Sequence, residues 1–332
     1  MTTPDAAPAS APDARPDRVI RGVRGALLAL AVGVAAAVLG LLPWIVAGSR
    51  VLPQDLWAED VASAADMPIA LLPFDPYTAS LLAAVIVVGG GIAGTAARLL
   101  RPRLPRAGAW LVLAGLLLVQ VVALVQTATV TADGLGVDDP QPAGVDRTGA
   151  GISEAQVYLV AFVAGTIAAM LVAAVVALLL ALAPAGVAVV AVALPAVLLG
   201  GWILGAVPPV AGFVRPPGPA LLVVARWIPP VVLGLAVAAT GLRGAGRIVG
   251  AVLAAVLLWL GQAAVTGVTS ALGSRALLRY PLELADFASA VFVAALGPPA
   301  RVLPELAVLA LVGVLGALVV RAVRRRRAVS AA

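Results

Sequence analysis

Eight long apolar stretches dominate this sequence, and its charged residues are gathered between them. A helix rises about 1.5 Å per residue, so about 20 apolar residues cover the roughly 30 Å of a bilayer's hydrocarbon. In lipid the backbone must satisfy its own hydrogen bonds, and uniformly apolar stretches lack the alternation of barrel strands. The sequence therefore predicts an all-α, polytopic transmembrane bundle with eight spans. The predicted spans cover residues 26–48, 79–97, 109–128, 157–183, 186–207, 219–240, 248–270 and 304–320.

Composition excludes a water-soluble fold. Hydrophobic residues make up 62% of the chain and charged residues only 11%. A soluble domain carries roughly 45–50% apolar and about 25% charged residues, because it must cover its core with a charged surface. This chain departs from both figures in the direction of a membrane protein.

Several kinds of chemistry are excluded by the residues that the chain lacks. It has no Cys and no His, so disulfides, thiolate chemistry, the usual general base and the commonest metal ligands are absent. Gly89, Gly90, Gly91 and Gly94 are not followed by the Lys-Ser or Lys-Thr of a phosphate loop, and we expect them to allow close helix packing. The sequence predicts no metal and no cofactor, and it shows no catalytic motif.

Arginine is distributed unevenly between the two sides of the predicted bundle. With eight spans, 15 of the 22 basic residues, all of them Arg, fall on one side together with three acids, and seven fall on the other side with thirteen acids. The positive-inside rule places the arginine-rich side in the cytoplasm, so both termini are predicted to be cytoplasmic. Abundant Ala, Gly, Val, Pro and Arg without Lys or Asn is typical of a GC-rich genome. We therefore expect the plasma membrane of a bacterium.

The stretches outside the spans complete the predicted domain organisation. Residues 1–20 form a disordered cytoplasmic tail, residues 21–325 the bundle, and residues 326–332 a basic cytoplasmic tail. The external loops are predicted at about 50–77, 130–155, 208–218 and 271–303. Within the last of these, residues 282–297 contain an apolar run too short to cross a bilayer. We predict that this run forms a short helix on the outer face, either interfacial or re-entrant.

Arg226 is the strongest candidate for a functional residue. It lies well inside the sixth predicted span, where an Arg costs roughly 2.5–3.5 kcal/mol on insertion scales. One interpretation is that it snorkels to the outer headgroups beside Trp227; the other is that it faces a substrate or pairs with an acid. Pro229 and Pro230 follow it, and Pro195 lies in the fifth span; we expect these three prolines to kink their helices, as helices lining a cavity often do.

Three further polar residues are candidates for lining a pathway. Gln120 and Gln262 lie within apolar stretches, and Asp286 lies at the predicted short helix. The alternative for the two glutamines is a hydrogen bond across a helix interface.

Two acidic residues and a cluster of basic residues are candidates for other functions. Glu59 and Asp60 lie in the first external loop, where membrane glycosyltransferases that use polyprenyl-phosphate sugars place a catalytic acid; the alternative is a solvated acidic loop. A basic cluster directly after the last span is better explained as an anchor on anionic lipid than as a nucleic-acid site. Its members are Arg321, Arg324, Arg325, Arg326 and Arg327.

Three classes of function remain open. The first is a transporter or permease-like subunit, which for an ATP-driven role needs a separate ATPase as partner, since the chain contains no nucleotide motif. The second is a non-catalytic scaffold or assembly partner for cell-envelope machinery. The third, with the least support, is a lipid-linked glycosyltransferase-type enzyme that uses Glu59 and Asp60.

Overall fold

The computed structural model describes residues 15–50, 57, 66–137, 153–207, 218–274 and 280–330. In these ranges the regular elements are α-helices and one short 3₁₀ helix, η1. Their order is α1 (Arg15–Val46), η1 (Pro76–Thr78), α2 (Ala79–Leu99), α3 (Gly108–Gly134), α4 (Glu154–Leu182), α5 (Ala185–Leu204), α6 (Pro219–Thr240), α7 (Ala245–Leu272), α8 (Pro281–Leu296) and α9 (Pro299–Ser330).

Eight of these helices are long and apolar enough to cross a membrane, which confirms the predicted polytopic bundle. The exception is α8, with 16 residues. The sixth predicted span coincides with α6. The last helix differs most, because α9 begins before residue 304 and stays helical to Ser330, through the stretch predicted as a basic tail.

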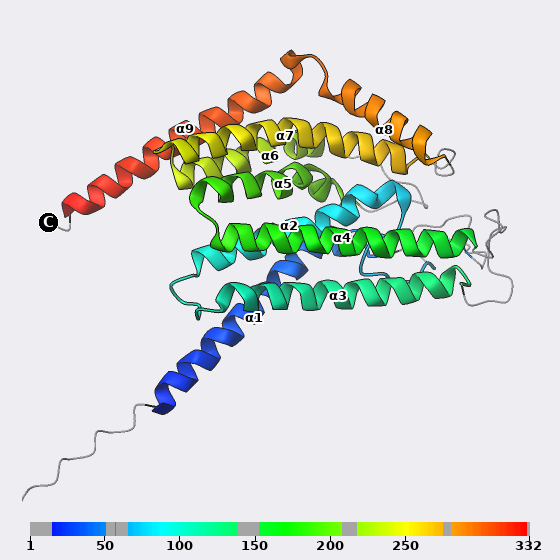
Figure 1. The fold of residues 1–332 in the computed structure, drawn as a ribbon, viewed down its shortest axis with the longest axis horizontal. Coiled ribbons are helices and arrows are strands. Elements are labelled where there is room, and N and C mark those ends of the chain that lie inside the picture. Colours follow the sequence, from blue (N-terminus) through cyan, green and yellow to red (C-terminus); the bar gives the residue numbers. More distant parts are fainter. Residues whose placement is uncertain are drawn as a thin grey trace, which may run out of the picture.

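The helices form two packed groups joined through α5. In the first group α1 packs on α2 and α3, and α2 and α3 pack on α4; in the second, α5 packs on α6 and α7, α6 on α9, and α7 on α8. Contacts of α5 with α2 and α4 connect the groups, and both ends of the described chain lie at the same end of the bundle (Figure 1).

Glycines allow the helices of the first group to approach one another closely. A Cβ atom on Gly90 of α2 would lie 2.6 Å from the carbonyl oxygen of Ala173 in α4, and one on Gly89 would lie 3.3 Å from the carbonyl oxygen of Ala36 in α1. A side chain at Gly90 would therefore separate the two helices. The packing role expected for the glycines of the second span is confirmed.

Charge divides the two ends of the bundle. We call the end where α2, α4 and α6 finish and α3, α5 and α7 begin the arginine-rich end, and the other the acidic end (Figure 1). Two arginines of the first end bind helix C-termini: Arg98 donates to the carbonyl oxygens of Leu180 and Ala183 at 2.7 and 3.0 Å, and Arg247 donates to that of Thr240 at 2.9 Å. A cation here satisfies orphan carbonyls and complements the helix dipole.

The segment that precedes α2 folds back onto the acidic end. The backbone N–H of Leu71 donates to Gln126 Oε1 at 2.9 Å, while Gln126 Nε2 donates to the carbonyl oxygen of Ile69 at 2.9 Å. The next N–H, of Leu72, donates to Thr127 Oγ1 at 2.9 Å. Two neighbouring side chains of α3 thus hold a non-helical stretch of backbone that was predicted as part of an external loop.

Aromatic side chains complete this attachment. Phe74 is fully buried and stacks on Phe162 of α4, with ring centroids 5.3 Å apart, and its carbonyl oxygen accepts a 2.6 Å hydrogen bond from the Tyr158 hydroxyl. Trp44 of α1 donates from Nε1 to the carbonyl oxygen of Ala70 at 2.7 Å. The segment therefore belongs to the core of the first helix group.

The short helix α8 runs back beside α7 and is inclined to it (Figure 1). Gly267 of α7 packs against Ala288, and Trp259 Nε1 donates to the carbonyl oxygen of Leu296 at 3.3 Å, so α8 ends beside the middle of α7. The chain then turns at Gly297, whose φ is +56°, and continues as α9. The short helix that was expected at residues 282–297 is therefore present as α8.

Candidate functional site

An ion pair joins α6 to α9. Arg226 Nε lies 3.0 Å from Glu305 Oε1, and each residue lies about two turns after the start of its helix. A hydrogen bond between two ionised groups is stronger than one between neutral groups, and a carboxylate partner offsets part of the cost of an Arg inside a span.

The packing of α6 on α9 brings the pair into register. Gly234 lies against Val312, Gly313 against Val237, and Gly316 against Ala238, so the two helices run in the same direction. Helices that start near the same level and run in parallel keep residues of equal depth beside one another. The ion pair is therefore a consequence of small-residue packing further along the two helices.

The two members of the pair have different surroundings. The Glu305 side chain is 11% exposed, whereas that of Arg226 is 51% exposed. Arg226 also lies over the ring of Trp227, with Cζ 5.3 Å from the ring centroid. Only Nε of the guanidinium bonds to Glu305, and its two terminal nitrogens donate to no residue that the structure describes. These nitrogens can bind a further anionic group in the bidentate manner of carboxylate and phosphate.

The prolines of this region do not divide their helices. α6 continues through Pro229 and Pro230, and α5 through Pro195. Since Pro229 has no N–H, the carbonyl of Ala225 loses its usual partner, and Gly200 of α5 lies against that carbonyl oxygen. The helical structure is interrupted instead at Gly297, between α8 and α9.

Gln120 lies in the core between α3 and α2, away from the ion pair. It is 3% exposed, and its Nε2 donates to the carbonyl oxygen of Ile86 at 3.1 Å. Its Oε1 is buried and accepts no hydrogen bond. This arrangement is the cross-helix hydrogen bond that was the alternative to a pathway role.

The structure does not gather the remaining candidates into one site. Gln262 is partly buried on α7, and its main-chain carbonyl accepts from the Thr266 hydroxyl at 2.9 Å. Asp286 is exposed on α8, and its main-chain carbonyl accepts from the Ser289 hydroxyl at 2.8 Å. Neither side chain bonds to Arg226 or Glu305.

Other predicted residues are placed only in part. Glu59 and Asp60 lie outside the described residues. The basic cluster continues along helix α9, where the Arg321 and Arg326 side chains are exposed; those of Arg324, Arg325 and Arg327 are not described. In the described part of the chain, no three Asp or Glu residues are grouped so that they could hold a metal ion.

Sequence reasoning missed Glu305 as the partner of Arg226. A signal was present, because Glu305 is the only acid of the last apolar stretch and stands close to its start, as Arg226 does in the sixth. Pairing the two also requires α6 and α9 to be neighbours, which local patterns do not reveal.

Comparison with known proteins adds no relative to this description: no protein-family model, no curated protein and no solved structure matches the chain.

Proposed function

We propose that this chain is a transporter or permease-like subunit in which Arg226 recognises an anionic group of the substrate. The observation that carries the proposal is the Arg226–Glu305 pair, in which the cation keeps two unengaged nitrogens within a helix of spanning length. Ionisable residues inside spans usually face a cavity or a partner and mark substrate or ion pathways. Glu305 holds the guanidinium in place when no substrate is bound.

The discontinuity before Glu305 supports the same proposal. α8 ends beside the middle of α7, and Gly297 separates it from the helix that carries Glu305. In many transporters, discontinuous helices form the substrate site near the middle of the membrane. A turn at this point lets the start of α9 move relative to α8 when an anion competes with Glu305 for Arg226.

The proposal includes a location and a partner. The membrane is the plasma membrane of a bacterium, with both termini in the cytoplasm, in agreement with the positive-inside rule for the arginine-rich end. The chain has no nucleotide-binding motif. An ATP-driven mode of action therefore uses a separate ATPase subunit.

The test compares Arg226→Gln with a gene deletion in the native host, where any partner is present. Anionic solutes inside and outside the cells are quantified by mass spectrometry. We expect the deletion to change the distribution of at least one of them, and Arg226→Gln to reduce its transport by roughly tenfold or more, since a hydrogen bond to a charged group is worth about 1.5–3 kcal/mol.

The matched control is Arg106→Gln, which removes an exposed arginine from the arginine-rich end. It is expected to behave as the wild type, provided that both variants insert in equal amounts. An unchanged solute distribution in the deletion strain, or normal transport by Arg226→Gln, would contradict the proposal.

A scaffold or assembly partner is the second candidate, and the surface of α9 favours it. Only 11% of the residues in the apolar window of α9 are buried. A stoichiometric protein that co-purifies in mild detergent, together with unchanged solute distribution in the deletion strain, would support this function over transport.

A further inference from the structure

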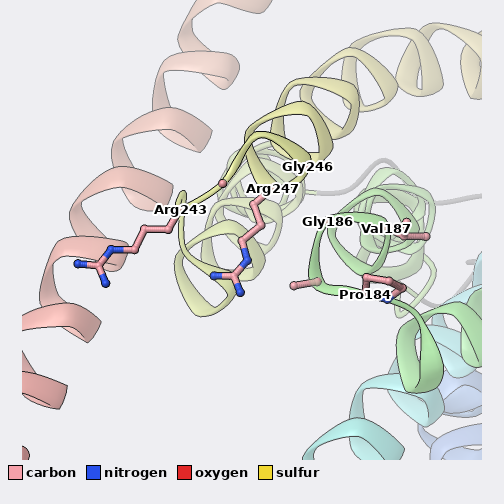
Figure 2. Close-up of a pocket in the computed structure, with 8 residues that line it drawn as sticks. Pro184, Gly186, Val187, Arg243, Gly246 and Arg247 are labelled. Atoms are coloured by element: carbon pink, nitrogen blue, oxygen red, sulfur yellow. The ribbon is translucent and has the colours of Figure 1, made fainter.

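A groove of 370 Å³ opens at the arginine-rich end, remote from the ion pair (Figure 2). The turn between α4 and α5 forms one wall, and the turn between α6 and α7 forms the other. The lining residues are Pro184, Ala185, Gly186, Val187, Arg243, Gly244, Gly246 and Arg247.

The groove exists because two helices start side by side. A Cβ atom on Gly186 of α5 would clash with the carbonyl oxygen of Gly246, and one on Gly250 of α7 would clash with that of Gly186. The lack of a side chain at Gly186 and at Gly250 therefore lets the first turns of α5 and α7 touch. Both helices begin here and run toward the acidic end, so their positive dipole ends lie together.

Two guanidinium groups border the same space. Arg247 is fixed by its hydrogen bond to the carbonyl oxygen of Thr240, which uses NH1 and leaves Nε and NH2 to donate elsewhere. In Figure 2 its side chain lies between that of Arg243 and Gly186, while Arg243 extends away from α5. Arg243 makes no hydrogen bond through its side chain to any described residue.

Nothing described at this groove balances its positive charge. The lining contains no carboxylate. Neither helix has a side-chain cap; the N–H of Arg247 donates to the carbonyl oxygen of Gly244 at 3.1 Å, but the other N–H groups of the first three residues of each helix donate to no acceptor in the described part of the chain. Two guanidinium groups and two adjacent helix N-termini, in a groove with no acid, attract an anion.

We propose that this groove binds a phosphate group. Its oxygens would accept from Arg247 and Arg243 and from N–H groups of the first turns of α5 and α7. The groove lies at the ends of spanning helices, where lipid headgroups are found, so the phosphate can come from an anionic phospholipid or from free phosphate.

The test measures the binding of two probes to the full chain in non-ionic detergent by calorimetry. One probe is short-chain phosphatidylglycerol and the other is inorganic phosphate. The Arg243→Gln/Arg247→Gln double variant removes the guanidinium groups of the groove. The Arg103→Gln/Arg106→Gln control removes the same charge from the neighbouring α2–α3 turn, outside the groove.

We expect the groove variant to bind at least one probe about tenfold or more weakly than the control variant. Loss of phosphatidylglycerol binding alone identifies a lipid as the source, and loss of phosphate binding identifies the free anion. Equal affinities of the two double variants for both probes, or no measurable binding of either probe to the wild type, would overturn the proposal.

Because Arg247 also caps α6, the double variant can lose stability for another reason. Arg243→Gln alone keeps that cap and is expected to weaken binding by a smaller factor. Arg247→Lys keeps the charge but not the planar donor set, so it is expected to retain part of the affinity. The proposal of a bound anion would be contradicted if Arg243→Gln bound the probes as tightly as the wild type and Arg247→Lys bound them as weakly as a variant with an uncharged residue at the same position.

Discussion

Loss of the Arg226 charge and loss of the Glu305 charge are expected to lower stability by different amounts. The glutamate side chain is 11% exposed, so without its cation it would be left as a buried charge. The arginine side chain is 51% exposed, and its long stem lets it reach another anion or the headgroup region. Loss of the arginine should therefore cost more stability than loss of the glutamate charge.

A double-mutant cycle measures this asymmetry. Arg226→Gln is expected to destabilise the purified chain by about 1–3 kcal/mol, because it leaves Glu305 without a cation, and Glu305→Gln by about 1 kcal/mol or less. The double variant should be more stable than Arg226→Gln alone, because the orphan carboxylate is then removed. Thermal unfolding in detergent provides the measurement, and strictly additive effects of the two substitutions would show that the pair is not coupled.

At the level of whole helices, backbone contact at glycine is what brings α2 and α4 together. Gly90 and Gly94 lie against the carbonyl oxygens of Ala173 and Ala177. In lipid, where there is little hydrophobic gain from joining two apolar helices, such close approach supplies much of the attraction. These positions should therefore tolerate a side chain poorly.

Gly90→Ala is expected to destabilise the bundle by about 1–3 kcal/mol, since the new methyl group would lie 2.6 Å from the carbonyl oxygen of Ala173. The matched control is Gly165→Ala in α4, where no atom lies within 4 Å of the added Cβ. There the better helix propensity of Ala should leave stability unchanged or raise it by up to about 1 kcal/mol. Equal unfolding temperatures for the two variants would refute a packing role for Gly90.

The number of spanning helices could be predicted because it depends on local apolar length, but the helix limits could not be predicted throughout, since α1 and α9 continue into arginine-containing sequence beyond their apolar stretches. The predicted span at 219–240 and the helix α6 have the same bounds. The partner of Arg226 could not be predicted, since it depends on which helix lies beside α6 and in what register, and that is decided by contacts such as Gly234 with Val312. For the same reason Gln126 and Thr127, which bind the segment before α2, gave no local sign of that role.

For the molecule as a whole, the described charged residues divide between the two ends of the bundle. The described arginines of the α2–α3 and α6–α7 turns share one end, and Asp66, Asp75, Asp133, Glu154 and Glu283 lie toward the other. Spans that alternate between these ends place every arginine-rich turn on the same side. Under the orientation that we propose from the positive-inside rule, with the arginine-rich end in the cytoplasm, α8 would enter the membrane from the outer side.

Cysteine labelling can test both the orientation and the depth of α8, because the chain has no cysteine of its own. A membrane-impermeant maleimide is applied to intact cells carrying Leu282→Cys, Ala295→Cys or Arg106→Cys. All three positions are exposed in the structure, so burial within the protein does not limit the reaction.

We expect Leu282→Cys, at the start of α8, to react in intact cells and Arg106→Cys to react only after permeabilisation. Ala295→Cys, near the end of α8, should react only after denaturation, because that end lies at the depth of the middle of α7. Labelling of Ala295→Cys as fast as Leu282→Cys would place α8 in the interface, and labelling of Arg106→Cys in intact cells would invert the orientation.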